Sequence, residues 1–186
     1  PKREDDTSPF KDLCGAGVAF KLCAALEGCE DPAELLEPFG ELAALGTIAD
    51  VMPLVGENRT IVKEGLATLQ DTLRPGLQAL LENAGYADRP VTAETVSYGL
   101  APRLNAAGRM DTAAVALKLL LCENEEQAAG IAARLSEINT SRQQAEQQIA
   151  AAALEKLSAD PARVLDRVIV VSGEGWHPGV IGIVAT

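Results

Sequence analysis

The spacing of apolar residues predicts a chain built mainly of helices. Apolar positions recur at steps of three and four over most of the sequence, which is the period of a helix with one buried face. The ranges that follow this pattern are about 14–27, 33–51, 59–69, 74–84, 92–100 and 113–122. Gly28 suits a C-cap of the first helix, Pro75 suits a first helical turn, and Thr92 and Asp111 suit N-caps of the last two. We therefore expect a mostly α-helical fold for this chain.

A further periodic stretch predicts one unusually long helix. Asn124 and Gln127 have the spacing of a capping box, and the pattern continues to about Ser158, roughly 35 residues or about 50 Å. The apolar positions are Ile131, Leu135, Ile138, Ala145, Ile149 and Ala152. The middle, residues 139–148, is too polar to be buried on all sides, which favours a strut between two domains. An isolated coiled coil is the alternative, although Arg142 weakens its heptad core.

The last part of the chain has a different pattern. Residues 167–172 are apolar and β-branched and predict a buried strand, but the chain offers no second strand to pair with it. A glycine-rich turn then leads to an apolar helix that starts at Pro178. His177, the only histidine, precedes that helix, where backbone N–H groups and an imidazole suit an anion; a lone histidine is more often structural. We expect an internal piece of a longer protein, ending in the start of a second, α/β domain.

Asp50 is the one carboxylate in the apolar run from Leu45 to Leu54. Pro53 is expected to end the preceding helix, because proline disfavours the helical conformation at the residue before it. An anion in apolar surroundings at the C-terminal end of a helix is unfavourable and calls for a cation. Arg59 in the next loop or a metal ion can supply that charge. Position alone favours an ion pair or a loop-capping role over a metal.

Residues 101–110 place Arg103, Asn105 and Arg109 among small residues between two predicted helices. We interpret this stretch as a loop whose small residues allow a ligand to approach closely. Two arginines six residues apart on a loop can converge on one phosphate, because guanidinium geometry suits phosphate oxygens. A solvated connector whose arginines pair with nearby acids explains the same residues equally well.

Composition narrows the class of protein. The 186 residues are 47% hydrophobic with mixed charges, which excludes a wholly disordered chain. The net charge of −11 argues against a surface that coats nucleic acid by bulk electrostatics, and 3% aromatic content leaves no visible platform for stacking bases. No apolar run is long enough to span a membrane and no basic leader suggests export. Four cysteines without metal-site spacing suggest reduced thiols in a cytoplasmic protein.

Four segments together resemble one known family. They are PKREDD with PFKDLCGAGVAFKL, ALGTIADVMPLVGENRTIVKEGL, APRLNAAGRM, and GWHPGVIGIVA, in that order. The chain resembles the middle of the RecJ family of single-strand-specific exonucleases, within the DHH phosphoesterase superfamily. The likeness covers nearly the whole chain. It implies an intact α/β protein in which residues 1–122 complete a catalytic domain, 123–160 form a connecting helix and 161–186 begin a DHH-associated domain.

The resemblance also implies roles for particular residues. Asp50 is similar to the last metal-binding aspartate of the catalytic domain, where two Mn²⁺ or Mg²⁺ ions act on the scissile phosphate. Arg103, Asn105 and Arg109 match a motif that grips substrate phosphate, and Arg109 is a candidate for stabilising charge as the phosphodiester breaks. The second domain's glycine-tryptophan-histidine motif matches at the following residues, which are expected to orient the DNA strand: Gly175, His177 and Gly179.

The implied activity is metal-dependent 5′-to-3′ hydrolysis of single-stranded DNA in repair and recombination, with repair and single-strand-binding proteins as partners. Because the family's other aspartates and its Asp-His-His motif are not in this chain, we expect the chain alone to be inactive. Two alternatives remain open from the sequence: a phosphodiesterase acting on oligonucleotides or cyclic dinucleotides, and a non-catalytic nucleic-acid-binding scaffold.

Overall fold

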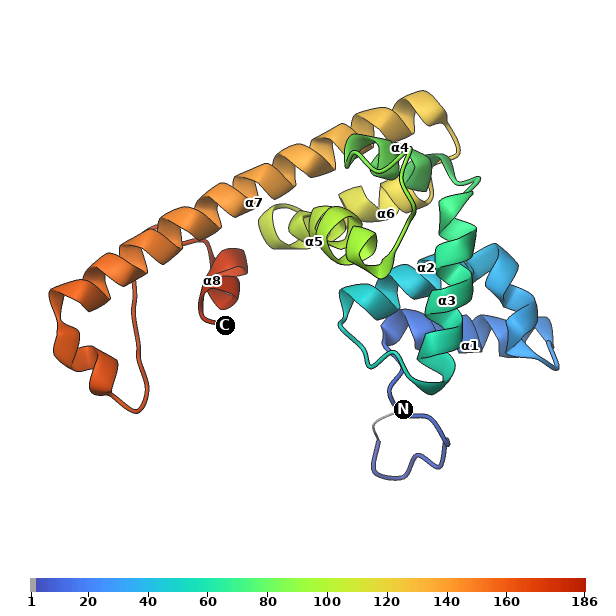
Figure 1. Ribbon diagram of the computed structural model, residues 1–186, viewed down its shortest axis with the longest axis horizontal. Helices are drawn as coiled ribbons and strands as arrows, with labels where there is room; N and C mark the ends of the chain where they lie inside the picture. Colours follow the sequence, from blue (N-terminus) through green and yellow to red (C-terminus); the bar gives the residue numbers. More distant parts are fainter. Residues whose placement is uncertain (1–2) are drawn as a thin grey trace.

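A computed structural model describes residues 3–186, apart from the side chains of residues 163 and 164 (Figure 1). Pro1 and Lys2, which open the first of the matched segments, lie outside the described residues. The elements are, in order, α1 (Gly15–Glu27), η1 (Pro32–Leu35), α2 (Leu36–Ala49), α3 (Gly56–Gln70), α4 (Pro75–Asn83), η2 (Thr95–Leu100), α5 (Ala101–Met110), α6 (Ala114–Leu120), α7 (Glu125–Ala159), η3 (Pro161–Leu165) and α8 (Pro178–Val184). The prediction of a mostly helical chain is confirmed.

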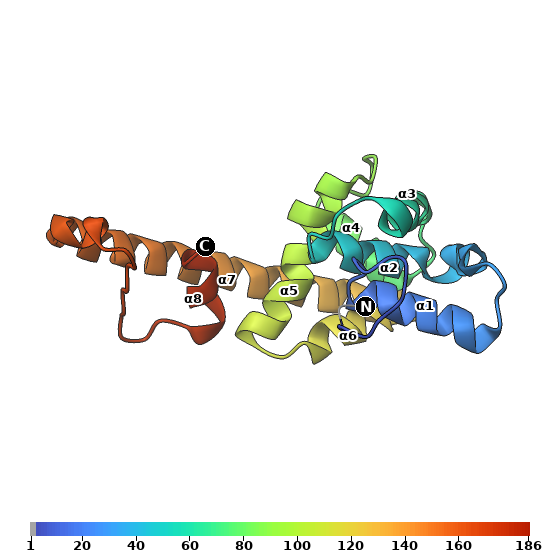
Figure 2. The same ribbon diagram turned by 90° about the horizontal axis from the view of Figure 1, so that it is seen from below.

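Helices α1 to α6 pack into one body on one side of the molecule (Figures 1 and 2). Its larger core joins residues from α2, α3, α4, η2, α5, α6 and the first half of α7, including the fully buried Leu69, Leu80, Leu119 and Leu135. Burial of side chains of this size contributes about 1.5–3 kcal/mol each. A smaller core centred on Phe20 joins α1 to α2 and α3. These contacts fix the ends of α2 and α5, where the candidate residues lie.

The crossing of α2 and α3 is unusually close. At Gly65 an added Cβ would lie 2.6 Å from the Ala44 Cβ and closer still to the Gly40 carbonyl. Only a residue without a side chain lets the two backbones approach in this way. Ala43 and Ile48 face inward from α2 and are buried, whereas Phe39 on the same helix is exposed.

A buried carboxylate on α2 forms an ion pair. Glu41 is buried, and the Nε of Arg74 donates to its carboxylate at 2.5 Å, while Arg74 also donates to the Pro38 carbonyl at 2.7 Å. The guanidinium compensates the buried charge at Oε1, whereas Oε2 has no hydrogen-bond partner among the described residues. The pair therefore ties α2 to the start of α4.

The long helix α7 has the predicted length and start. It runs for 35 residues from Glu125, and the Asn124 side chain accepts a hydrogen bond from the Gln127 backbone at 2.9 Å. Ala128, Ala132 and Leu135 in its first half are buried in the helical body. Beyond that body the helix continues alone as far as α8, which lies beneath its second half (Figure 1).

Several local predictions need correction. Residues 101–110 are helical, because α5 continues directly from the π-helical turn η2. Asp111 does not cap α6; its carboxylate pairs with Arg134 at 2.8 Å, and the Thr112 hydroxyl accepts from the first turn instead. Helix α3 begins at Gly56, three residues earlier than predicted.

Residues 167–172 do not form a strand; the chain there has no regular secondary structure. A strand exists only when a partner completes its hydrogen bonds, and no other strand occurs among residues 3–186. The helix predicted to follow is α8, which begins at Pro178 as expected. None of the described helices has the length and apolar character required to cross a membrane.

Candidate functional site

Asp50 occupies the C-cap of α2, so Pro53 ends the helix close to where the sequence predicted. Its backbone N–H donates to the Gly46 carbonyl at 3.0 Å. The side chain is exposed, and no ion pair joins it to Arg59 in the described part of the chain. The expected ion pair with Arg59 is therefore wrong, because water solvates this carboxylate in the described chain, while the alternative of a metal ion stays a prediction. Solvent access leaves the carboxylate free to bind a ligand from the open side.

The turn after Asp50 has an unusual backbone. Val51 has a φ of 54°, in the left-handed region that β-branched residues rarely adopt, and its side chain is 88% exposed. Such a conformation costs of order 1–3 kcal/mol and persists only where neighbouring contacts enforce it. Backbone hydrogen bonds close this turn: the Val51 N–H donates to the Ile48 carbonyl at 3.0 Å, and the Met52 N–H donates to the Thr47 carbonyl at 3.1 Å. Just beyond the turn, the fully buried Asn58 side chain donates to the Asp12 carbonyl at 2.7 Å and to the Pro53 carbonyl at 3.0 Å.

Sequence reasoning missed both features. An asparagine in the first turn of α3 can be noticed as a potential loop clamp, because its amide has two donors and an acceptor. The left-handed valine has no sequence signal, since valine is among the residues least suited to that conformation. Both residues fix the path of the chain immediately after Asp50.

Arg103, Asn105 and Arg109 project from α5 rather than from a loop. Because a helix turns about 100° per residue, positions six apart differ by about 120°, and the two arginines do not converge. Arg103 faces α7 and its own helix, donating to the Ser136 hydroxyl at 2.9 Å and to the Gly99 carbonyl at 2.6 Å. Asn105 and Arg109, four residues apart, share one exposed face.

The end of α5 meets the start of α8. Arg109 donates to the Gly179 carbonyl at 3.3 Å, and a Cβ at Gly179 would come within 3.0 Å of the Arg109 carbonyl carbon. Position 179 therefore requires glycine for this approach. The fold thus brings two motifs that are 70 residues apart in sequence into direct contact.

His177 is the N-cap of α8. Its Nδ1 accepts from the Gly179 backbone N–H at 3.1 Å, so a neutral ring carries its proton on Nε2 as a hydrogen-bond donor. Gly175 has a φ of 74°, which allows the tight turn before the cap. Near the junction of α5 and α8 the chain therefore carries the Arg109 guanidinium, the Asn105 side-chain amide and the His177 imidazole N–H. These hydrogen-bond donors suit an anionic ligand.

The described residues do not form a metal centre by themselves. No group of three or more histidine, cysteine, aspartate or glutamate side chains within residues 3–186 is arranged to hold an ion. Asp50 has the hard oxygen ligands that Mn²⁺ and Mg²⁺ prefer, but one carboxylate is not a site.

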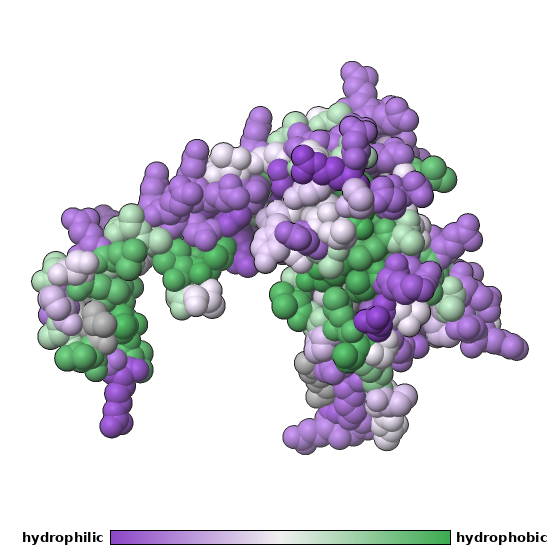
Figure 3. Space-filling view, viewed as in Figure 1, coloured by the Kyte–Doolittle hydropathy of each residue, from purple (hydrophilic) through white to green (hydrophobic). Residues whose placement is uncertain are grey.

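The helices that carry the candidate residues border an open hollow (Figure 3). In the space-filling view this hollow lies beneath α7, between α8 and the helical body (Figure 3). The outer side of α7 is hydrophilic, and green hydrophobic residues gather on both sides of the hollow (Figure 3). The C-terminal end of α2 and the face of α5 toward α8 both lie on the hollow's side of the helical body (Figure 1).

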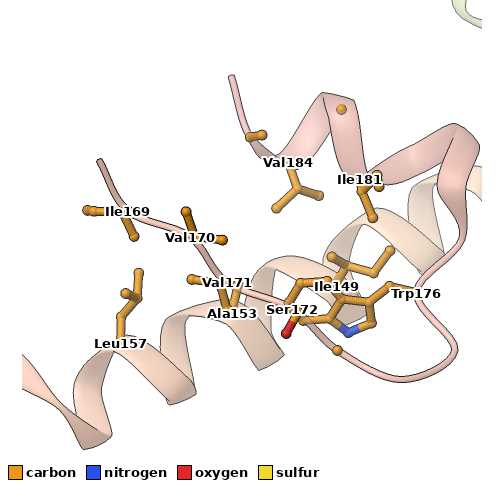
Figure 4. A pocket seen from close by; sticks show the side chains of 13 residues that line it. Ile149, Ala153, Leu157, Ile169, Val170, Val171, Ser172, Trp176, Ile181 and Val184 are labelled. Carbon is orange, nitrogen blue, oxygen red and sulfur yellow. The ribbon is translucent and has the colours of Figure 1, made fainter. Parts of the chain in front are cut away.

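A second hollow is an apolar groove between α7 and α8. Its volume is about 680 Å³, and Ile149, Leu157, Val171, Trp176 and Ile181 line it together with neighbouring residues (Figure 4). Lys156 borders the groove, with its Nζ 5.7 Å from the centre of the Trp176 ring and 2.5 Å from the Ser172 carbonyl. The lining is apolar and lacks the charged groups of the α5–α8 junction.

Known proteins similar to this chain share one description. No family model matches the chain. The single-stranded-DNA-specific exonuclease RecJ of Bacillus subtilis is 45% identical over 187 residues, covering all of this chain and 23% of that protein. The corresponding RecJ of Salmonella typhimurium is 38% identical and is covered to 34%, so the chain spans between about a quarter and a third of these curated relatives.

Solved structures agree with the sequence comparison. The chain superposes on a crystal structure of exonuclease RecJ bound to manganese with a TM-score of 0.82 and 41% identity, covering 96% of this chain and 44% of that one. RecJ from Thermus thermophilus in complex with Mn²⁺ gives a TM-score of 0.80 and 40% identity, covering 94% of this chain and 26% of that one.

Proposed function

We propose that the intact protein is a metal-dependent exonuclease, because this chain belongs to the RecJ family. Its substrate is single-stranded DNA, hydrolysed from the 5′ end. The observation that carries this proposal is the contact between Arg109 at the end of α5 and Gly179 at the start of α8. It assembles phosphate-binding chemistry from two motifs at the edge of an open hollow, where a flexible strand can enter.

Asp50 is proposed as one carboxylate ligand of a Mn²⁺ or Mg²⁺ site whose remaining ligands come from elsewhere in the intact protein. Its exposure and oxygen ligands support this role. The metal site would supply Lewis-acid activation of the phosphodiester. The Asn58 clamp and the turn at Val51 hold the carboxylate at a fixed place at the end of α2.

Arg109 and Asn105 are proposed to bind the phosphate backbone on the exposed face of α5, with Arg109 also stabilising charge during bond cleavage. Arg103 is proposed as a further substrate contact, reached from the side of α5 nearest α7. His177 would donate from Nε2 to the strand or its terminal phosphate, while Gly175 and Gly179 allow the tight turn and the close approach that set its position.

We propose that residues 1–122 belong to the catalytic domain, 123–160 form the connecting helix and 161–186 begin the second domain. Helix α7 supports this division, because its first half packs in the helical body, its middle is polar and its second half contacts α8. The apolar groove between α7 and α8 is the kind of surface that the core of a second domain provides (Figure 4). The superfamily label DHH, a role in repair and recombination, partner proteins of those pathways and a cytoplasmic location belong to the same proposal.

The activity is tested by comparing the intact protein with the 186-residue chain. We expect the intact protein to shorten a 3′-labelled single-stranded oligonucleotide in the presence of Mn²⁺, and the chain alone to leave it unchanged, because residues 3–186 contain no complete group of metal ligands. Gel analysis of the products gives the result. Absence of turnover by the intact protein overturns the proposed function, and metal-dependent turnover by the chain alone overturns the proposed source of the ligands.

Replacing Arg109 by alanine in the intact protein is expected to weaken cleavage about 10- to 100-fold, since the change removes a charged hydrogen-bond donor. Kinetics with a short oligonucleotide measures the effect. Arg89→Ala is the matched control, because Arg89 is an exposed arginine on the same body without a proposed role. Equal kinetics for both variants contradict the assignment of Arg109.

A further inference from the structure

Tyr98 is an exposed aromatic residue directly before the arginine-asparagine-arginine motif. Its side chain is 76% exposed, whereas Tyr86, the other tyrosine, is mostly covered and packs against Gly99. An exposed tyrosine ring offers an apolar face for stacking and a hydroxyl that can remain in water.

The helix places Tyr98 on the same side as the proposed phosphate contacts. Helix η2 continues into α5 without a break, and Asn105 and Arg109 follow Tyr98 by seven and eleven residues, roughly two and three helical turns. All three side chains are exposed. The opposite face carries Val96, Leu100 and Ala107, which are fully buried, so the two faces are clearly separated.

The segment that carries Tyr98 is a π-helical turn, Thr95–Leu100, in which the Ala101 N–H reaches back to the Val96 carbonyl. Turns of this kind are rare and are frequent at functional sites. The wider turn separates Tyr98 from the α-helical part of the face and presents its ring about 16 Å along the axis from Arg109. That distance corresponds to a few nucleotides of an extended single strand.

Charge decides which part of a nucleotide suits Tyr98. Glu94 lies one turn earlier on the same side and is exposed, so its carboxylate disfavours a phosphate at this end. At the other end Arg109 favours one. A neutral base stacked on an aromatic ring is compatible with a neighbouring carboxylate, and stacking on aromatic rings is the usual sequence-tolerant contact of single-stranded nucleic acid.

We propose that Tyr98 is a substrate-binding residue that stacks on one base of a single strand, a few nucleotides away from the phosphate held at Arg109. This inference rests on the proposed function, because it takes the face of Asn105 and Arg109 as the path of the strand. It adds a base contact to a site otherwise made of phosphate contacts. The contact is sequence-tolerant and selects unpaired strands, because a base within a duplex already stacks on its neighbours.

The test uses the intact protein and fluorescent single-stranded oligonucleotides of fixed length. Tyr98→Ala is expected to raise the Kd about tenfold, while Tyr98→Phe, which keeps the ring, binds like the wild type. Leu73→Ala is the matched control, because it also truncates a highly exposed side chain of the same body. Thermal unfolding of each variant is expected to be unchanged, since Tyr98 contributes little to the core.

Abasic oligonucleotides locate the contact. Each oligonucleotide of a series carries one abasic site at a different position. We expect the abasic site to weaken wild-type binding at one particular position. Tyr98→Ala is expected to bind that oligonucleotide as tightly as it binds the unmodified strand. Equal affinities of Tyr98→Ala and wild type, or equal abasic losses in both, overturn the stacking contact. A lower unfolding temperature for Tyr98→Ala, with equal loss on every oligonucleotide, assigns Tyr98 to a protein interface instead and also overturns it. If wild-type protein binds and cleaves no single-stranded DNA, the proposed function itself fails.

Discussion

Replacing Asp50 by asparagine in the intact protein is expected to lower hydrolysis of single-stranded DNA by about two orders of magnitude or more. The change removes the negative charge of a proposed metal ligand but keeps its size. Because the Asp50 side chain is exposed and makes no ion pair within the described chain, folding is expected to be unaffected. Steady-state kinetics measures turnover, and titration calorimetry with Mn²⁺ provides a readout independent of activity.

Asp71→Asn is the matched control for Asp50→Asn. Asp71 occupies the C-cap of α3, as Asp50 does for α2, and it is also exposed. A general effect of removing a carboxylate from a helix end would therefore be seen in both variants. Full activity or unchanged Mn²⁺ affinity of Asp50→Asn would contradict the role of Asp50 as a ligand.

Gly65→Ala is expected to lower the free energy of unfolding by about 2–3 kcal/mol. The new methyl group would meet the Gly40 carbonyl and the Ala44 side chain where α2 and α3 cross, so the two helices must move apart. Urea unfolding of the 186-residue chain, followed by far-UV circular dichroism, measures the change.

Gly130→Ala is expected to have the opposite sign. Gly130 is an exposed position within α7 with nothing within 4 Å of an added Cβ, and alanine is the better helix former, so stability should rise by about 0.5–1 kcal/mol. Destabilisation of both variants by the same amount would show that close packing is not the cause at Gly65.

Local signals in the sequence predicted helix ends well where a cap or a special residue was present. Gly28 ends α1 with a φ of 68°, Pro75 starts α4, and Asn124 caps α7 as the capping-box spacing indicated. Each of these residues acts through its own backbone or side chain, so neighbours along the chain are sufficient to identify it. The mostly helical fold followed from the same information.

The error at residues 101–110 has a physical cause. Pro102 normally breaks a helix because it lacks an N–H and crowds the carbonyl four residues earlier. Here the preceding π turn has already shifted the carbonyl ladder, and Arg103 donates to the Gly99 carbonyl. Proline is thereby accommodated within a continuous helix, an outcome that no propensity of the individual residues indicates.

Other features depend on contacts that a sequence pattern does not contain. The turn that follows Asp50 places Val51 in the left-handed region, and residues 167–172 have no pairing strand in the described chain. The contact between Arg109 and Gly179 depends on α7 carrying the chain past α5 and on residues 160–177 bringing it back (Figure 1). The resemblance identified the two motifs separately, but only the fold brings them together.

The number of residues in α7 sets how the segments after it, including α8, are oriented about the helix axis. One residue inserted into its exposed middle would move the far end by about 1.5 Å and rotate it by about 100°, turning α8 away from Arg109. Seven inserted residues would lengthen the span by about 10 Å but restore the orientation to within about 20°. Orientation is therefore far more sensitive than distance to a single insertion in this helix, whereas seven inserted residues restore the orientation but move α8 about 10 Å from Arg109, so either change breaks the contact between Arg109 and Gly179.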